Sequence, residues 1–144
     1  MCGIVRHSLA VLVVLCLGSL SAETAGGEPP HANFDPEKGR SLYTTYCRSC
    51  HAENGGGRPG MFPPLKGSGM VTKDDATKQI RAVLDGLQGG RVGGVLYANP
   101  MPAFGSILTD VEIADIIDYE RSSWGNHARL VIAAHVAAER HHPK

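Results

Sequence analysis

The sequence has few cysteines, and this limits the sites it can form. The 144 residues include four, and two of these, Cys2 and Cys16, lie in an apolar N-terminal stretch. Without that stretch only Cys47 and Cys50 remain, so no disulfide framework of several bridges is possible. The only other close pair of Cys or His is His141-His142 near the C-terminus, which is too little for an ordinary structural zinc site.

The sequence also lacks an excess of charge. Fourteen Lys and Arg balance fourteen Asp and Glu, for a formal net charge of zero. Binding to nucleic acid normally requires a basic patch or stripe, so we expect no nucleic-acid partner. Without the first 22 residues the chain has roughly 120 residues, enough for one domain.

A long hydrophobic run is the third absence. The apolar stretch at residues 9–17 is short of the roughly 20 residues that a membrane span needs. It follows Arg6 and precedes small residues, which predicts a secretory signal peptide over residues 1–22 and a periplasmic location. The alternative is a retained membrane anchor, and only then would we expect a membrane partner. We expect a flexible leader over residues 23–34 and the folded domain over residues 35–142.

The most informative motif is Cys47-Arg-Ser-Cys50-His51. A C-x-x-C-H run is the attachment signal for a c-type haem. The two thiols add to the two vinyl groups of one haem, and the next side chain supplies an imidazole to the iron. The sequence therefore predicts one covalent haem c, with His51 as an axial ligand. The alternatives are half a zinc site, a thioredoxin-like redox pair and a structural disulfide, and no βαβ pattern supports the redox pair.

A second axial ligand is predicted at Met101, which stands between Pro100 and Pro102. Prolines hold the neighbouring backbone extended, and a rigid segment suits a thioether on a flexible side chain. The sulfur would complete a His/Met haem, which has a raised potential and an iron closed to small molecules. Competing ligands are Met61, Met70, His127 and His135, and the other reading of Met101 is an apolar core residue.

Two further contacts to the haem are predicted. A carbonyl of the Pro63-Pro64 turn, assigned to Pro64, would accept the Nδ1 proton of His51 and fix its ring. The alternative is an ordinary proline-rich turn without that contact. Arg58 would pair with a haem propionate, or else be a solvated loop residue.

The hydrophobic periodicity predicts an all-α domain with three main helices and a short C-terminal helix. The expected helices cover about residues 36–47, 72–87, 109–122 and 129–140. Thr109 and Glu112 form a capping box, and Gly93-Gly94 favours a small hairpin. The acidic residues of the third helix are expected to form a solvated face or, less expectedly, a docking patch. They are Asp110, Glu112, Asp115, Asp118 and Glu120.

These segments together resemble class I c-type cytochromes, and are closest to the mono-haem domains that serve bacterial alcohol and sugar dehydrogenase systems. The matching segments are the attachment motif and residues 62–65, 101–105, 108–119 and 121–126. The resemblance implies a small cytochrome c fold, thioethers at Cys47 and Cys50, and iron ligation by His51 and Met101. It also implies that Gly39 and Tyr119 meet where the terminal helices cross. Glu120 departs from the family pattern, which more often has an apolar residue there.

The function expected on these grounds is single-electron transfer, without a catalysed reaction of its own. The resemblance suggests a dehydrogenase, oxidase or reductase as redox partner, or a dehydrogenase complex in which the chain is the electron-transfer subunit. The rival function is a haem enzyme or gas sensor with an open sixth coordination site, which would require that Met101 is not a ligand.

Overall fold

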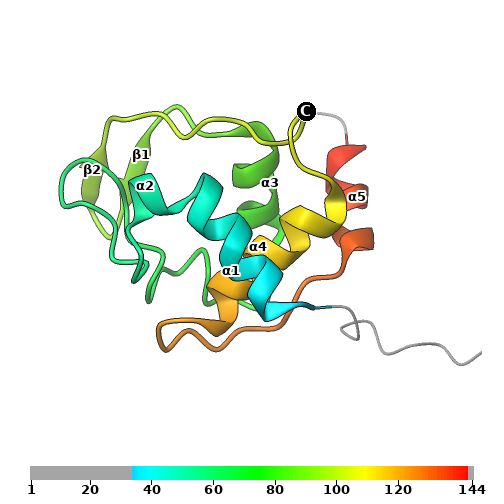
Figure 1. The fold of residues 1–144 in the computed structure, drawn as a ribbon. Coiled ribbons are helices and arrows are strands. Elements are labelled where there is room, and N and C mark those ends of the chain that lie inside the picture. Colours follow the sequence, from blue (N-terminus) through cyan, green and yellow to red (C-terminus); the bar gives the residue numbers. More distant parts are fainter. Residues whose placement is uncertain (1–33, 143–144) are drawn as a thin grey trace, which may run out of the picture.

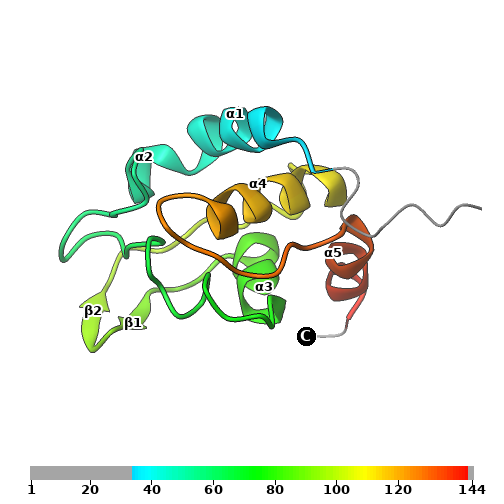
Figure 2. The same cartoon turned by 90° about the horizontal axis from the view of Figure 1, so that it is seen from below.

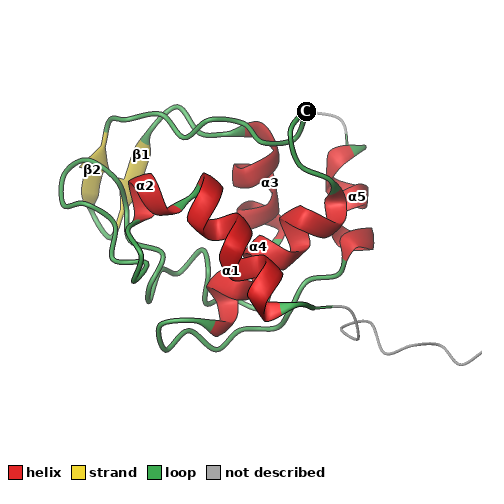
Figure 3. Ribbon diagram, in the orientation of Figure 1, coloured by secondary structure: helices red, strands yellow, loops and turns green. Residues whose placement is uncertain are grey.

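The fold is described by a computed structural model that covers residues 34–142. The predicted signal peptide and nearly all of the predicted leader lie outside the described residues. In the described part the chain is helical, with one small antiparallel hairpin (Figures 1 and 3). The elements are α1 (Pro36–Tyr46), α2 (Arg48–His51), α3 (Thr77–Asp85), β1 (Gly90–Val92), β2 (Val95–Tyr97), α4 (Asp110–Ser122) and α5 (Ala133–Arg140). The predicted helical class is confirmed, but α2 adds a short helix that was not predicted as a separate one.

Helices α1 and α4 pack against each other, crossing in the view of Figure 1 and lying one above the other in Figure 2. Asp35 caps α1 by accepting hydrogen bonds from the amides of Glu37 and Lys38. Gly39 lies at the crossing, where a Cβ would collide with the carbonyl of Asp115 and lie 3.0 Å from the Cβ of Tyr119. The glycine inside α1 therefore permits close approach of the two backbones, as the resemblance implied for this pair of positions.

Helix α4 begins at the predicted capping box. The Thr109 hydroxyl accepts from the Glu112 amide at 3.3 Å, and the Glu112 carboxylate accepts from the Thr109 amide at 2.9 Å. Its apolar side, with Ile113, Ile116 and Ile117, is at most 1% exposed and belongs to the core. The helix end is closed by Trp124, whose ring packs against Tyr43 and Tyr119 within the same domain.

The predicted solvated face of α4 is wrong for three of its five acids. Asp115, Asp118 and Glu120 are only 4%, 2% and 4% exposed. Other elements cover the helix on these sides and provide donors: Lys38 for Asp115 at 3.2 Å, the Val131 amide for Asp118 at 2.6 Å, and Gln79 for Glu120 at 2.8 Å. Buried carboxyl groups are tolerated where such partners exist.

Helix α3 begins at Thr77, about five residues later than predicted. In a helix begun at Lys73, the Thr77 amide would bond to the Lys73 carbonyl. That amide instead donates to the Asp75 side chain at 2.9 Å, and the buried guanidinium of Arg121 takes the carbonyls of Lys73 and Asp74. Contacts to α4 therefore replace the predicted first turn.

The chain after α4 folds back and covers α3 and α4 with α5. Arg81 of α3 pairs with Glu139 of α5 at 2.9 Å. Arg140 pairs with Asp110 at 2.8 Å and donates to the carbonyls of Gly105 and Leu108. In the region spanning residues 34–142, no helix is long and apolar enough to cross a membrane.

Candidate functional site

The two cysteines and the histidine of the attachment motif share one helical turn. Cys47 ends α1 and begins α2, and its carbonyl accepts from the amides of Cys50 at 3.2 Å and His51 at 2.9 Å. Residues three and four apart are neighbours on a helix surface, so the turn places Cys50 and His51 each next to Cys47. Both thiols are free, and burial raises the pKa of the Cys47 thiol.

His51 is held in one orientation and one tautomer. Its side chain is buried, and Nδ1 lies 2.9 Å from the carbonyl oxygen of Pro63. A carbonyl can only accept, so Nδ1 carries the proton and Nε2 keeps its lone pair. Burial lowers the pKa of His51, which favours the neutral, ligating form. The contact was assigned to Pro64 from the sequence; the structure corrects it to the preceding residue.

The loop after His51 follows a path that brings the Pro63 carbonyl within hydrogen-bonding distance of Nδ1 of the imidazole. The Gly57 amide donates to the His51 carbonyl at 2.9 Å, and Arg58 and Phe62 form a backbone bridge. Gly57 has φ +67°, and a Cβ there would lie 2.6 Å from the Pro63 carbonyl oxygen. Only glycine adopts such a conformation readily, so Gly57 permits the close packing behind the His51 acceptor.

Met101 belongs to a different segment of the chain and is positioned through its backbone. Its amide donates to the Leu87 carbonyl at 2.9 Å, and its carbonyl accepts from the Leu87 amide at 3.0 Å. Phe104 and Gly105 extend this anchoring by donating to the carbonyls of Val83 and Leu84 in α3. The backbone of Met101, the predicted second axial ligand, is thus fixed to the segment that ends α3.

His51 and Met101 line the same cavity, which has a volume of about 470 Å³. Such a volume lies within the range of cofactor pockets, roughly 300–1,000 Å³. Cys47 is also part of the wall. Much of the rest is apolar, and includes Tyr46, Leu65, Val71, Val83, Phe104, Leu108 and Ile116. A flat, largely apolar group attached to a cysteine and ligated by a neutral imidazole fits this lining.

The lining of this cavity distinguishes between the other candidate ligands of the iron. Met70 lines it together with Met101. Met61 is 49% exposed and, like the exposed His127 and His135, is absent from its wall. No group of three His, Cys, Asp or Glu side chains in the described part of the chain is arranged to hold a metal ion, so nothing there supports the zinc alternative.

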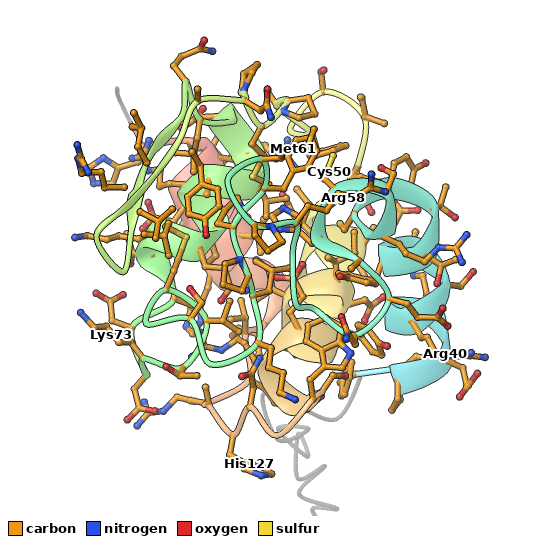
Figure 4. All side chains as sticks on the ribbon, turned by 90° about the vertical axis from the view of Figure 1, so that its left-hand side faces the viewer. Arg40, Cys50, Arg58, Met61, Lys73 and His127 are labelled. Carbon is orange, nitrogen blue, oxygen red and sulfur yellow. The ribbon has the colours of Figure 1, made fainter. Side chains whose placement is uncertain are left out.

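Arg58 does not contribute to the cavity wall. In Figure 4 it lies on the same side of the molecule as Cys50 and Met61, well away from Lys73. The basic residues that do line the cavity are Lys73, Lys78 and Arg91. A contact between Arg58 and a propionate stays a prediction.

A buried polar network reaches the cavity from α4. Arg121 is fully buried and donates to the side-chain oxygen of Gln79 at 3.0 Å, and the Gln79 amide donates to Glu120 at 2.8 Å. Gln79 and Glu120 both line the cavity. The sequence pattern does not predict this network, because it places Glu120 on a solvated face. The only signal was that Glu120 departs from the family pattern.

Comparisons with known proteins show the family to which the chain belongs. The profile of the family described as Cytochrome c matches residues 36–124. The cytochrome c subunit of alcohol dehydrogenase (quinone) from Gluconobacter oxydans (strain 621H) is 35% identical over 96 residues, covering 67% of this chain and 20% of that subunit. The cytochrome c subunit of gluconate 2-dehydrogenase from Pantoea cypripedii is 35% identical over 101 residues, covering 69% and 23%.

A smaller relative matches more of its own length. A cytochrome c-552 from Thermus thermophilus is 32% identical over 124 residues, which cover 83% of this chain and 74% of that protein. By contrast, this chain spans about a fifth of the dehydrogenase subunits that it matches. The profile match covers more than half of the chain and includes the attachment motif, and the chain therefore belongs to the cytochrome c family, whose members carry covalently bound haem c.

Proposed function

We propose that this protein is a single-electron carrier whose haem is attached through Cys47 and Cys50 and ligated by His51 and Met101. The observation that carries the proposal is that His51 and Met101 line one cavity while each is fixed by hydrogen bonds, His51 at its ring and Met101 at its backbone. The haem supplies an iron that gains and loses one electron. The protein residues hold the ligands in place and exclude water, so that little rearrangement accompanies the electron.

The rival function, an enzyme or sensor with an open sixth site, requires Met101 to be displaced. Its two backbone hydrogen bonds to Leu87 argue against this, because the thioether is held at the cavity wall rather than on a free loop. Met70 shares the wall and is the residue that the experiment must separate from Met101.

The test is the visible and near-infrared spectrum of the haem-loaded protein with Met101→Ala. We expect the weak sulfur-to-iron band of the oxidised protein to disappear in Met101→Ala, and carbon monoxide to bind the reduced variant but not the wild type. Met61→Ala is the matched control, since Met61 lies outside the cavity wall. Loss of the band in Met70→Ala alone would transfer the ligand role to Met70, and carbon monoxide binding to the wild type would favour the rival.

We further propose that the protein is exported to the periplasm and exchanges electrons with a dehydrogenase, oxidase or reductase. The dehydrogenase relatives support the first class of partner. Cys50 and the half-exposed Met61 both lie on the face shown in Figure 4, where Met61 offers an apolar contact to a partner protein. Mass spectrometry of the mature N-terminus tests the export, and stopped-flow reduction by a purified dehydrogenase tests the partner. An intact N-terminus would contradict cleavage of the signal peptide. If the dehydrogenase did not reduce the protein, dehydrogenases would be excluded as its redox partners.

A further inference from the structure

Glu120 is a carboxylic acid at the wall of the haem cavity. It is 4% exposed and lies on the side of α4 that faces the cavity. Its Oε2 accepts one hydrogen bond, from the Gln79 side chain at 2.8 Å. Among residues 34–142 no Lys, Arg or His nitrogen forms an ion pair with it. A buried carboxylate without a direct cation depends strongly on any charge that changes nearby.

The side chain of Gln79 is oriented so that its NH₂ group, and not its oxygen, faces Glu120. Its side-chain oxygen accepts from Nη1 of Arg121 at 3.0 Å, which leaves the amide nitrogen for the carboxylate. The other acceptors of the Arg121 guanidinium are backbone carbonyls of Lys73, Asp74 and Arg129. The positive charge of Arg121 therefore reaches Glu120 through one intervening amide, which supports the carboxylate without neutralising it directly.

The titratable and charged groups around Glu120 come from several elements. From α1, Tyr43 and Cys47 are close enough for their pKa values to be raised by Glu120, after burial as the main cause. Lys73, Asp75, Lys78 and Arg91 line other parts of the cavity. Asp118, on α4 itself, is bound to the Val131 amide. Burial raises the pKa of Glu120 to about 7, against the opposing effect of the Gln79 hydrogen bond.

We propose that Glu120 is a redox-linked proton site, which takes up one proton when the haem is reduced and releases it on oxidation. One electron arrives from the redox donor and one proton from water, so the net charge of the cavity stays constant. The physical reason is that an added electron in a water-poor cavity raises the proton affinity of a nearby carboxylate. The inference rests on the proposed electron-carrier function, and adds that the carrier moves a proton with its electron.

The experiment measures the midpoint potential of the haem-loaded protein between pH 5 and 9, for the wild type and Glu120→Gln. For the wild type we expect a range around neutral pH in which the potential falls as pH rises, by at most about 59 mV for each tenfold drop in proton concentration. In Glu120→Gln this fall should be absent, and above neutral pH its potential should exceed that of the wild type. The haem propionates can also titrate, but they are present in both proteins. The difference between the two pH profiles of the midpoint potential therefore reports on Glu120 alone.

Asp118→Asn is the matched control. Asp118 is also a buried carboxyl of α4, and burial raises its pKa to about 7, but it does not line the cavity. We expect this variant to keep the wild-type fall in potential. Equal pH profiles for the wild type and Glu120→Gln would overturn the proposal, as would a fall lost equally in Asp118→Asn.

Infrared difference spectra of the wild type provide a second readout that needs no variant to fold. Reduction should produce the C=O stretching band of a protonated carboxylic acid, and the band should shift in D₂O. Its absence at neutral pH would contradict proton uptake by a carboxyl group. Failure of the electron-carrier proposal would appear differently, as carbon monoxide binding to the reduced wild type, so the two failures are distinguishable.

Discussion

The two predicted axial ligands line the same cavity but are held in different ways. His51 is fixed at the side chain, through the hydrogen bond from its ring to the Pro63 carbonyl. Met101 is fixed only at the backbone, through its pair of hydrogen bonds to Leu87. A thioether is a weak acceptor and offers little for such a bond. Its placement therefore depends on where the chain runs, whereas the imidazole is also oriented directly.

Each ligand nevertheless depends on one glycine with positive φ, which packs against the acceptor of His51 in one case and against the Met101 backbone in the other. Gly57 has φ +67° and lies against the backbone of Pro63. Gly86, the last residue bonded to α3, has φ +71°, and a Cβ there would lie 2.5 Å from the Met101 carbonyl oxygen and 2.9 Å from the Ala103 nitrogen. The same chemical change can therefore be made on both sides, and the responses compared.

The largest effect is expected for Gly86→Ala on the Met101 side. The methyl group must push the Met101 backbone away, and φ 71° with ψ −180° is a conformation that is essentially restricted to glycine, so an alanine there costs about 1–3 kcal/mol in addition. With overpacking, we expect a loss of about 3 kcal/mol in the free energy of unfolding and a weakened or absent sulfur-to-iron band. Denaturant unfolding and the near-infrared spectrum measure the two effects.

The matched control is Gly60→Ala, because Gly60 has the same φ of +71° and a methyl group added there would meet no atom within 4 Å beyond its chain neighbours. It should cost only the backbone strain and keep the band. If Gly86→Ala behaved like this control, the packing of Gly86 against Met101 would not position the thioether.

Gly57→Ala should destabilise the fold to a similar or slightly smaller degree and leave the sulfur-to-iron band intact. The methyl would displace the Pro63 carbonyl, but His51 directly follows Cys50 and is held by the attachment of the haem as well as by its hydrogen bond. We expect a loss of about 2–3 kcal/mol, with a shifted ring-proton resonance of His51 by NMR.

Its control is Gly67→Ala, which has the same φ of +67° and open space around the new methyl. The comparison between the two sides would fail if Gly57→Ala abolished the Met101 band as completely as Gly86→Ala, since both glycines would then act through general loosening of the fold.

Local signals in the sequence predicted the elements that depend on near neighbours. The Asp35 cap, the Thr109 capping box and the Gly93-Gly94 turn of the hairpin involve residues at most three apart, and all three occur. His51 and Met101 were likewise predicted as ligands from their flanking residues, and both line one cavity in the structure.

What the sequence did not reveal depends on contacts between distant segments. The late start of α3 follows from Arg121, which reaches back 48 residues to the Lys73 carbonyl. The burial of Glu120 follows from Gln79, which is 41 residues away. An acidic residue on a helix is by default exposed, and only the packing of α3 against α4 shows otherwise.

The smallest effect is expected for Arg140→Gln, which tests whether α5 supports the Met101 side. Its guanidinium donates to the Leu108 carbonyl at 3.0 Å and to the Gly105 carbonyl, and pairs with Asp110 at 2.8 Å, but its side chain is 26% exposed. Because the pair is partly solvated, we expect a loss of about 1 kcal/mol in the free energy of unfolding. The band should persist at neutral pH, since the hydrogen bonds between Leu87 and Met101 do not involve Arg140.

Arg40→Gln is the control for the loss of a guanidinium, because Arg40 pairs with Glu37 on the surface at 3.0 Å, with both side chains exposed. Such pairs contribute little, so its unfolding midpoint should match that of the wild type. Arg140 lies beyond residues 36–124, the part that matches the family profile. If Arg140→Gln lost the band, the Met101 side would depend on the C-terminal helix as well as on α3, and the contrast with the locally fixed His51 would become sharper.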